Sequence, residues 1–186
     1  MRILILIAIT GASGTLIAIK LLSVLKTKKI QTELIISKAA EQVLLNESKI
    51  KITDLQQLAT NYYDVDDLTA PPASGSYKTD GMIIVPCTMK TLAAIANGFS
   101  DNLITRAADV TIKEKRKLIL IVRESPLSPI HLENMLKLAR LGVVIAPPVP
   151  SYYIIPESVE ELIDHTVGRI LDQIGIESEI KRWGND

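Results

Sequence analysis

An apolar run at residues 3–9 leads directly into a turn of small residues, and this pair of features most constrains the fold. The turn at residues 10–14 reads TGASG, after which Ile17, Leu21 and Leu25 recur at helical spacing. A strand that is apolar on both faces is typical of the centre of a parallel sheet. Small residues between such a strand and a helix leave room for an anion beside the free N–H groups of the helix. The sequence therefore predicts a phosphate cradle at this turn.

The composition favours an α/β fold, with residues 1–186 expected to form a single domain. Apolar residues make up 47% of the chain and aromatic residues only 4%, so aliphatic side chains must fill the core. Lysine plus arginine and aspartate plus glutamate both number 21, which disfavours nucleic acid or a membrane as a partner. Cys87 is the only cysteine, and no stretch approaches the roughly 20 apolar residues of a membrane span. We therefore expect a cytoplasmic protein.

Alternation of strand, polar turn and helix continues along the chain and predicts a parallel sheet with helices on both faces. The turns place Ser37, residues 88–91 and the pair Arg123 and Glu124 directly after strands, where open α/β sheets bind their ligands. Leu132, Met135, Leu136 and Ala139 are the expected buried stripe of one helix. The predicted strands are 3–9, 33–36, 81–85, 118–122 and 143–146, and the predicted helices are 39–45, 55–59, 92–97, 102–115, 129–141 and 159–174.

Two features of dinucleotide sites are missing from this sequence, and this limits the kind of ligand that the first turn can bind. A dinucleotide site has the pattern GxGxxG and an acidic residue after the second strand, whereas this chain has GASG and then Ser37. The sequence therefore favours a mononucleotide such as FMN. An acidic loop that holds Asp64, Asp66 and Asp67 is interpreted as a solvated loop rather than a metal site, because no helix frames it.

With these turns identified, the chain resembles the flavin prenyltransferases of the UbiX/Pad type, in a flavoprotein superfamily that also holds the phosphopantothenoylcysteine decarboxylases. The resemblance implies a flavodoxin-like Rossmann fold, a homo-oligomer that is commonly a dodecamer, and transfer of a dimethylallyl group to reduced FMN. The prenylated FMN would serve a UbiD-type decarboxylase. The motifs are TGASG at 10–14, ISKAA at 36–40, APPASGS at 70–76, PC at 86–87 with KTL at 90–92, RAADV at 106–110, KEKR at 113–116, RE at 123–124 and RWG at 182–184.

The resemblance also implies roles for individual residues. Glu124 is expected to be the acid/base, assisted by Ser13 and Glu47, with Lys113 as a further catalytic residue. Dimethylallyl phosphate is expected to contact Tyr153, Arg169, Lys113 and Arg123. The expected FMN contacts are Gly11, Ala12, Ser13, Ser37, Thr88, Met89, Lys90, Thr91 and Arg123.

The chemistry of these residues agrees with that reaction, since an allylic phosphate ionises only if the departing anion is stabilised. Basic side chains and a tyrosine could hold a monophosphate, so no metal is expected to be required. Leu68, Met89 and Ile154 depart from common family residues and alter the expected walls of the prenyl pocket. The alternatives are an FMN-dependent decarboxylase, which should carry a histidine near the first helix, and a flavin carrier without chemistry. A diphosphate donor also stays open.

Overall fold

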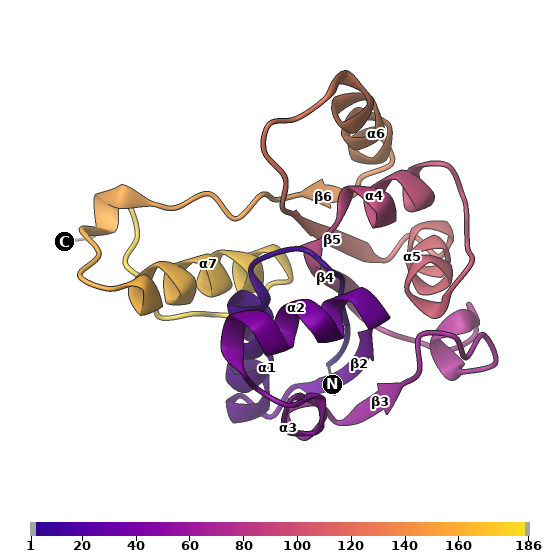
Figure 1. Cartoon of the computed structure of the whole chain (residues 1–186), viewed down its shortest axis with the longest axis horizontal. Helices are drawn as coiled ribbons and strands as arrows, with labels where there is room; N and C mark the ends of the chain where they lie inside the picture. The colour runs from indigo at the N-terminus through magenta and orange to yellow at the C-terminus, as the bar shows by residue number, and fades with distance from the viewer. Residues whose placement is uncertain (1–2, 185–186) are drawn as a thin grey trace.

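The computed structural model describes residues 3–184 and places a parallel sheet at the centre of the chain (Figure 1). The sheet has six strands in the order β3-β2-β1-β4-β5-β6, and each strand pair is parallel. Apart from the short β3, this is the flavodoxin-like order, with its switch point between β1 and β4. The strands are β1 (Leu4–Ile9), β2 (Gln31–Ile36), β3 (Asn61–Tyr63), β4 (Gly81–Cys87), β5 (Lys117–Val122) and β6 (Val144–Ile145).

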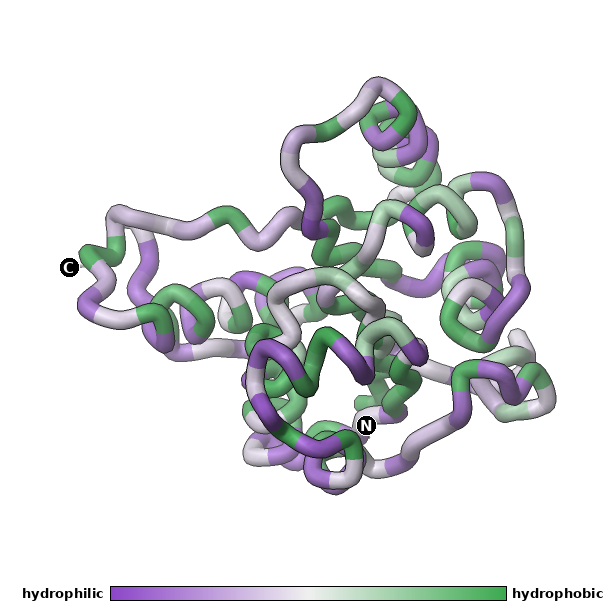
Figure 2. The backbone as a smooth tube through the Cα atoms, viewed as in Figure 1, coloured by the Kyte–Doolittle hydropathy of each residue, from purple (hydrophilic) through white to green (hydrophobic). Residues whose placement is uncertain are grey.

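Helices cover both faces of the sheet, as the alternation predicted. In β1, Ile5, Ile7 and Ile9 pack on one face with α1, α2, α3 and α7, while Leu6 and Ala8 pack on the other with α4, α5 and α6. Figure 2 shows the resulting concentration of apolar residues in the central strands. The helices are α1 (Thr15–Thr27), α2 (Lys38–Ser48), α3 (Ile52–Gln56), α4 (Met89–Ala96), α5 (Leu103–Lys113), α6 (Pro129–Arg140) and α7 (Val159–Gln173), with 3-10 turns η1 (Pro71–Ala73) and η2 (Tyr152–Ile154).

The predicted buried stripe of α6 is wrong. Leu132 and Leu136 are each 51% exposed, and Leu138 is the residue of this helix that is fully buried. The physical reason is that α6 stands at the margin of the molecule, where its main packing within one chain is on α4 and β6 (Figure 1). An apolar face that one chain leaves open is typical of a surface that another protein covers.

Three boundaries also differ from the predictions. The strand predicted at residues 81–85 continues through Pro86 and Cys87, because the carbonyl of Pro86 accepts hydrogen bonds from Thr10. The helix predicted at 55–59 lies earlier, at Ile52–Gln56, and the short edge strand β3 was not predicted. Within residues 3–184, no helix is both long enough and apolar enough to cross a membrane.

Candidate flavin and phosphate sites

A cavity of about 740 Å³ opens at the carboxyl ends of β1, β2 and β4, beside the switch point of the sheet. It brings together five of the predicted flavin contacts, which come from three separate turns of the chain. Val65, Phe99 and Asn102 supply further walls that the sequence interpretation did not include. The predicted residues in its lining are Gly11, Ser37, Thr88, Lys90 and Thr91.

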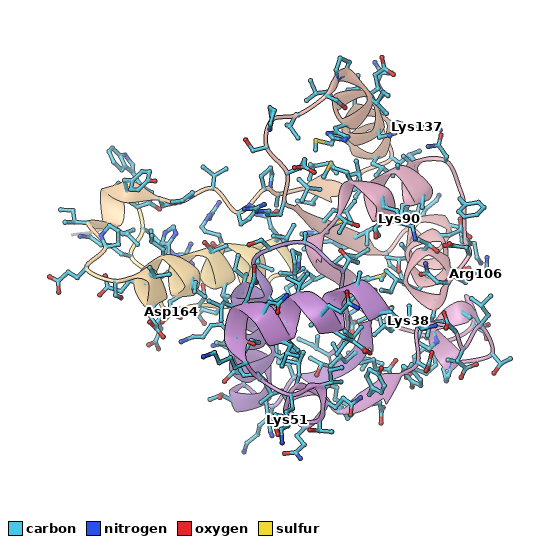
Figure 3. The ribbon with its side chains drawn as sticks, in the orientation of Figure 1. Lys38, Lys51, Lys90, Arg106, Lys137 and Asp164 are labelled. Atoms are coloured by element: carbon cyan, nitrogen blue, oxygen red, sulfur yellow. The ribbon has the colours of Figure 1, made fainter. Side chains whose placement is uncertain are left out.

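Two helix N-termini face this cavity, and each is capped by a predicted residue. The Ser37 hydroxyl accepts the Ala40 N–H at 3.2 Å at the start of α2, and the Thr88 hydroxyl accepts the Thr91 N–H at 3.2 Å at the start of α4. The positive ends of both helix dipoles therefore point at the same space. Lys90, in the first turn of α4, adds a full positive charge to the cavity lining (Figure 3).

Lys38 also lines the cavity, but its charge is already paired. Its ammonium contacts the carboxylate of Asp66, which raises the pKa of Lys38 through that hydrogen bond and the charge of Asp66. Asp67 accepts from the backbone N–H and the hydroxyl of Thr69. The acidic loop therefore makes hydrogen bonds to itself and to Lys38, as expected of a solvated loop.

The turn after β1 is fixed against both neighbouring strands. Thr10, which is 2% exposed, donates its hydroxyl to the Pro86 carbonyl at 2.7 Å and accepts the Thr88 N–H at 2.9 Å. Gly11 approaches α2 so closely that a Cβ atom there would lie 2.6 Å from the Cβ of Ala39. Glycine is therefore required at this position to keep the turn beside the cavity.

The N-terminus of α1 already holds an anion, which corrects the prediction of a phosphate cradle there. The carboxylate of Glu47 accepts the Gly14 N–H at 3.0 Å, the Thr15 N–H at 2.9 Å and the Thr15 hydroxyl at 2.7 Å. Burial alone would raise the pKa of Glu47, but hydrogen bonds from Ser13, Thr15 and Gly14 lower it overall. The structure thus brings Ser13 and Glu47 together and leaves α2 and α4 as the helix N-termini open to a phosphate.

Arg123 and Glu124 follow β5, at the same edge of the sheet. The Arg123 N–H donates to the Cys87 carbonyl at 3.1 Å, which ties this segment to the end of β4. The Glu124 carboxylate accepts the Ser125 N–H at 3.0 Å, and both charged side chains are exposed. Neither side chain lines the cavity, so their predicted contact with a bound flavin remains a prediction.

The other expected FMN contacts lie in the same turns. Ala12 and Ser13 are half-buried in the turn after β1, and the Ala12 N–H donates to the Thr10 carbonyl at 2.8 Å. Met89 opens α4, but its side chain packs on the core cluster of that sheet face. Leu68 is 47% exposed in the acidic loop, away from the lining of the cavity.

Tyr153 and Arg169 lie on a separate group of elements at the C-terminal end of the chain. A second cavity, of about 210 Å³, is lined by Arg169 of α7 and by Ile121, two residues before Arg123. Arg169 donates to Asp172 at 2.8 Å, and Arg182 binds the same carboxylate through two contacts of 2.8 Å. The hydrogen bonds and charges of the two arginines lower the pKa of Asp172, with Arg182 the larger cause.

Lys113 is not brought to this edge of the sheet within one chain. It ends α5 before β5 begins, so it lies at the amino edge, where its ammonium pairs with Glu114 at 2.6 Å. The run of β5 separates it from Arg123 by roughly 3.3 Å for each strand residue. Within α5, Arg106 binds Asp109 at 3.0 Å, while Lys113 pairs with Glu114.

Several residues that build these sites escaped the sequence interpretation. The sequence around Thr10 did not predict its hydrogen bonds to β4, because its only notable feature is its place before a glycine. Asp172 is one of several polar residues of a long helix, so its pairing with two arginines could not be predicted. Cys87 is fully buried, and burial raises the pKa of its thiol, as is typical of a structural cysteine. His131 caps α6 by accepting the Ser128 N–H at 3.2 Å.

Chemically, the arrangement offers two places for anions at one end of the sheet. The larger cavity combines two helix N-termini with Lys90, which suits the phosphate of a mononucleotide. The second cavity combines Arg169 with hydroxyl groups. Within residues 3–184, no three histidine, cysteine, aspartate or glutamate side chains gather as a metal site requires.

Comparison with known proteins agrees with this chemistry. A family model described as Flavoprotein matches residues 2–174. The chain is 50% identical to a flavin prenyltransferase UbiX of Methanocaldococcus jannaschii over 181 residues, which cover 97% of this chain and 98% of the relative.

Two solved structures are similar along almost their whole length. The first, AnUbiX (PadA1) in complex with FMN and dimethylallyl pyrophosphate, has a TM-score of 0.98 and 47% identity, covering 100% of this chain and 99% of the other. The second is described as a dodecameric FMN-dependent Ubix-like decarboxylase from Escherichia coli O157:H7. It has a TM-score of 0.96 and 44% identity, covering 98% of this chain and all of its own.

Proposed function

Because this chain belongs to the flavoprotein family, and within it to the flavin prenyltransferases of the UbiX/Pad type, we propose that it transfers a dimethylallyl group to reduced FMN. The observation that supports the proposal is a pair of separate cavities at one end of the sheet, each lined by a basic side chain. A flavin carrier needs only one such site. A decarboxylase that relies on a histidine near the first helix is disfavoured, because His131 caps α6 and His165 lies on α7.

In this proposal the FMN phosphate binds at the N-termini of α2 and α4. Ser37, Thr88 and Thr91 supply hydroxyl and N–H groups, and Lys90 supplies the positive charge. The small residues Gly11, Ala12 and Ser13 let the ring system approach the end of β1. Gly11 supports this placement of the ring system, because a Cβ atom at this position would clash with α2 and displace the turn.

The second anion site binds the phosphate of the prenyl donor. The allylic carbon–oxygen bond breaks with its electron pair leaving on phosphate, and the freed carbon forms a new bond to the reduced flavin. Arg169, Tyr153 and Arg123 stabilise the negative charge that develops on the departing phosphate. Closing a ring requires a second bond, in which a flavin ring carbon adds to the double bond of the prenyl group. The double bond takes up one proton and the flavin carbon loses one, and Glu124 transfers these protons with the assistance of Ser13 and Glu47.

Lys113 can take its proposed place beside the donor phosphate only from a neighbouring copy of the chain. It is exposed at the amino edge of the sheet, while Arg123 and Arg169 lie near the carboxyl edge. We therefore propose a homo-oligomer, as large as a dodecamer, and the exposed apolar face of α6 supports such contacts. Mixed oligomers of the Lys113→Ala and Arg169→Ala variants should recover part of the activity that each variant lacks alone.

The central test is anaerobic incubation with reduced FMN and dimethylallyl phosphate in the presence of EDTA, followed by mass spectrometry of the flavin. We expect the mass of one added prenyl group, and an unchanged flavin would reject the proposal. A parallel reaction with dimethylallyl diphosphate identifies the donor. The Glu124→Gln variant should bind FMN normally and form product slowly, whereas unchanged turnover would remove Glu124 from its role.

The product is proposed to serve as the cofactor of a UbiD-type decarboxylase. The reaction mixture, filtered to remove protein, should activate such a decarboxylase prepared without its cofactor. A mixture made with the Glu124→Gln variant, stopped at the same time, is the control and should activate less. Equal activation by both mixtures would contradict the assignment.

A further inference from the structure

His165 is a buried polar side chain that has no role in the proposed reaction. It is 5% exposed on α7, whose other buried side chains include Val167, Ile170 and Leu171 of the core. The chain contains only two histidines, and the other one caps α6. A buried polar ring calls for a specific partner.

That partner is Tyr153. The Nε2 atom of His165 lies 3.0 Å from the Tyr153 hydroxyl, and the two rings meet edge to face with centroids 5.5 Å apart. The other side of Tyr153 meets the ring of Trp183, with centroids 5.4 Å apart. The loop around Tyr153 has only short local backbone bonds, such as Ile155 N–H to the Tyr152 carbonyl. His165 and Trp183 therefore hold this tyrosine in place.

His165 also stands next to the second anion site. It lies one helical turn before Arg169, and both side chains line the cavity of about 210 Å³ together with Ser151. The hydroxyl that His165 binds is thus in the same region as the guanidinium assigned to the donor phosphate.

A tyrosine hydroxyl has a single proton to donate, so the state of its partner decides where that proton points. When Nε2 of His165 carries no proton, the Tyr153 O–H donates to the histidine and is not available to an anion. When Nε2 is protonated, it donates to the Tyr153 oxygen, and the Tyr153 O–H is left for an anion. We propose that His165 is a positioning residue that frees the Tyr153 hydroxyl for the donor phosphate, an inference that rests on the proposed function of Tyr153.

Several charged groups surround His165. Arg169 lies one turn further along the same face of α7. Glu161 and Asp164 of α7, with Glu179 and Lys181 of the C-terminal segment, line a cavity of about 220 Å³ that His165 also borders. His165 therefore stands between the cavity that Arg169 lines and this charged cavity.

The test compares three proteins by their KM for dimethylallyl phosphate at one pH. In His165→Gln, the side-chain amide can still donate to the Tyr153 oxygen, so its KM should stay within about threefold of the wild-type value. His165→Leu has no group that holds the hydroxyl in place, so its KM should exceed that of His165→Gln about tenfold, with kcat nearly unchanged.

Binding supplies a readout besides activity. Trp183 is the only tryptophan, and its contact with Tyr153 should make its fluorescence report the binding of dimethylallyl phosphate to the FMN-loaded protein. The Kd values should follow the same order as the KM values. In a Tyr153→Phe background, replacing His165 by leucine should change neither constant, because no hydroxyl remains to be oriented.

His131→Gln is the matched control, since it removes the other histidine from a position outside both cavities, and it should keep the wild-type KM. The inference is overturned if His165→Leu leaves KM unchanged, or if His165→Gln raises KM as much as His165→Leu does. A wild-type protein that forms no prenylated flavin would instead reject the proposed function. The two failures are therefore distinguishable.

Discussion

The two anion sites are built in contrasting ways. The larger cavity is made from turns that follow buried strands, and its polar groups are held by short hydrogen bonds such as that from the Thr88 N–H to the Thr10 hydroxyl. The second site depends on long side chains from α7 and the segment that precedes it. The side chain of Arg169 is 54% exposed, while Thr10 is 2% exposed. The proposed flavin side is thus built from groups that the fold holds in place, whereas the proposed donor side depends on exposed side chains.

This contrast fits the order in which a transfer reaction uses its sites. A cofactor-like acceptor gains affinity when its site is rigid, because little conformational entropy is lost on binding. A donor whose phosphate departs needs contacts that strengthen as charge develops, and long arginine side chains can adjust to that change. Substitutions in the first region should therefore affect FMN affinity, and those in the second should affect the donor.

The largest effect is expected for Gly11→Ala. The added Cβ atom would lie 2.6 Å from the Cβ of Ala39, so the turn must move away from α2 and distort the cavity. FMN affinity should fall by about a hundredfold or more, equivalent to about 3 kcal/mol, when measured by flavin fluorescence. The double variant with Ala39→Gly removes the nearest clashing atom and should recover part of the loss. Wild-type affinity in the single variant would show that the first region is not rigid.

Arg169→Ala should act on the donor alone. Loss of a hydrogen bond between charged groups corresponds to a rise of about ten- to a hundredfold in the KM for dimethylallyl phosphate. FMN affinity should be unchanged in a titration of the same protein. Arg140→Ala, on the exposed side of α6, is the control for removing an arginine from a helix. A large loss of FMN affinity in Arg169→Ala would mean that the two regions are not separate.

Ser37→Ala and Ser128→Ala form a matched pair. Both serines cap helices by accepting an N–H, at 3.2 Å in α2 and 3.3 Å in α6, but only Ser37 lines the larger cavity. Each variant should lose about 1 kcal/mol of unfolding free energy in urea. Only Ser37→Ala should also lose about tenfold in FMN affinity. If both variants bound FMN equally, the Ser37 hydroxyl would be a cap and nothing more.

The smallest effect is expected for Glu47→Gln. The folded-state pKa of Glu47 is lowered, so its contribution to stability is present above the unfolded pKa near 4.5 and is lost as the pH falls through the folded value. The variant should therefore be less stable than wild type by no more than about 1 kcal/mol at pH 7, with the difference shrinking below pH 4.5. Urea unfolding at several pH values measures this. A constant difference would show that the negative charge is not what stabilises the turn.

Much of the fold followed from the sequence because it depends on local patterns. Apolar runs marked the central strands, and the small or polar residues after them marked the ligand edge. The failures have a common cause, which is that they depend on distant contacts. The exposure of Leu132 depends on where α6 lies in space, and the extension of β4 through Cys87 depends on Thr10, more than seventy residues earlier.

The same reasoning applies to the sites. Gly11, Ser37, Thr88, Lys90 and Thr91 were grouped correctly, because each directly follows a strand of one sheet. Lys113 was grouped with Arg123 by family resemblance, although α5 carries it to the other edge. The positions of Tyr153 and His165 in the sequence did not predict their contact, because a loop brings the tyrosine back onto α7.

The carboxylate of Glu47 at the start of α1 also bears on which solutes can compete with the substrates. Free phosphate and nucleotides are abundant anions, and an open helix N-terminus would bind them without discrimination. Here the chain supplies its own permanent occupant, at 2.9 to 3.0 Å from two backbone N–H groups. A free anion must displace a tethered one whose effective concentration is far higher. The two N–H groups beside Ser13 are therefore satisfied by the chain itself rather than left open to a free anion.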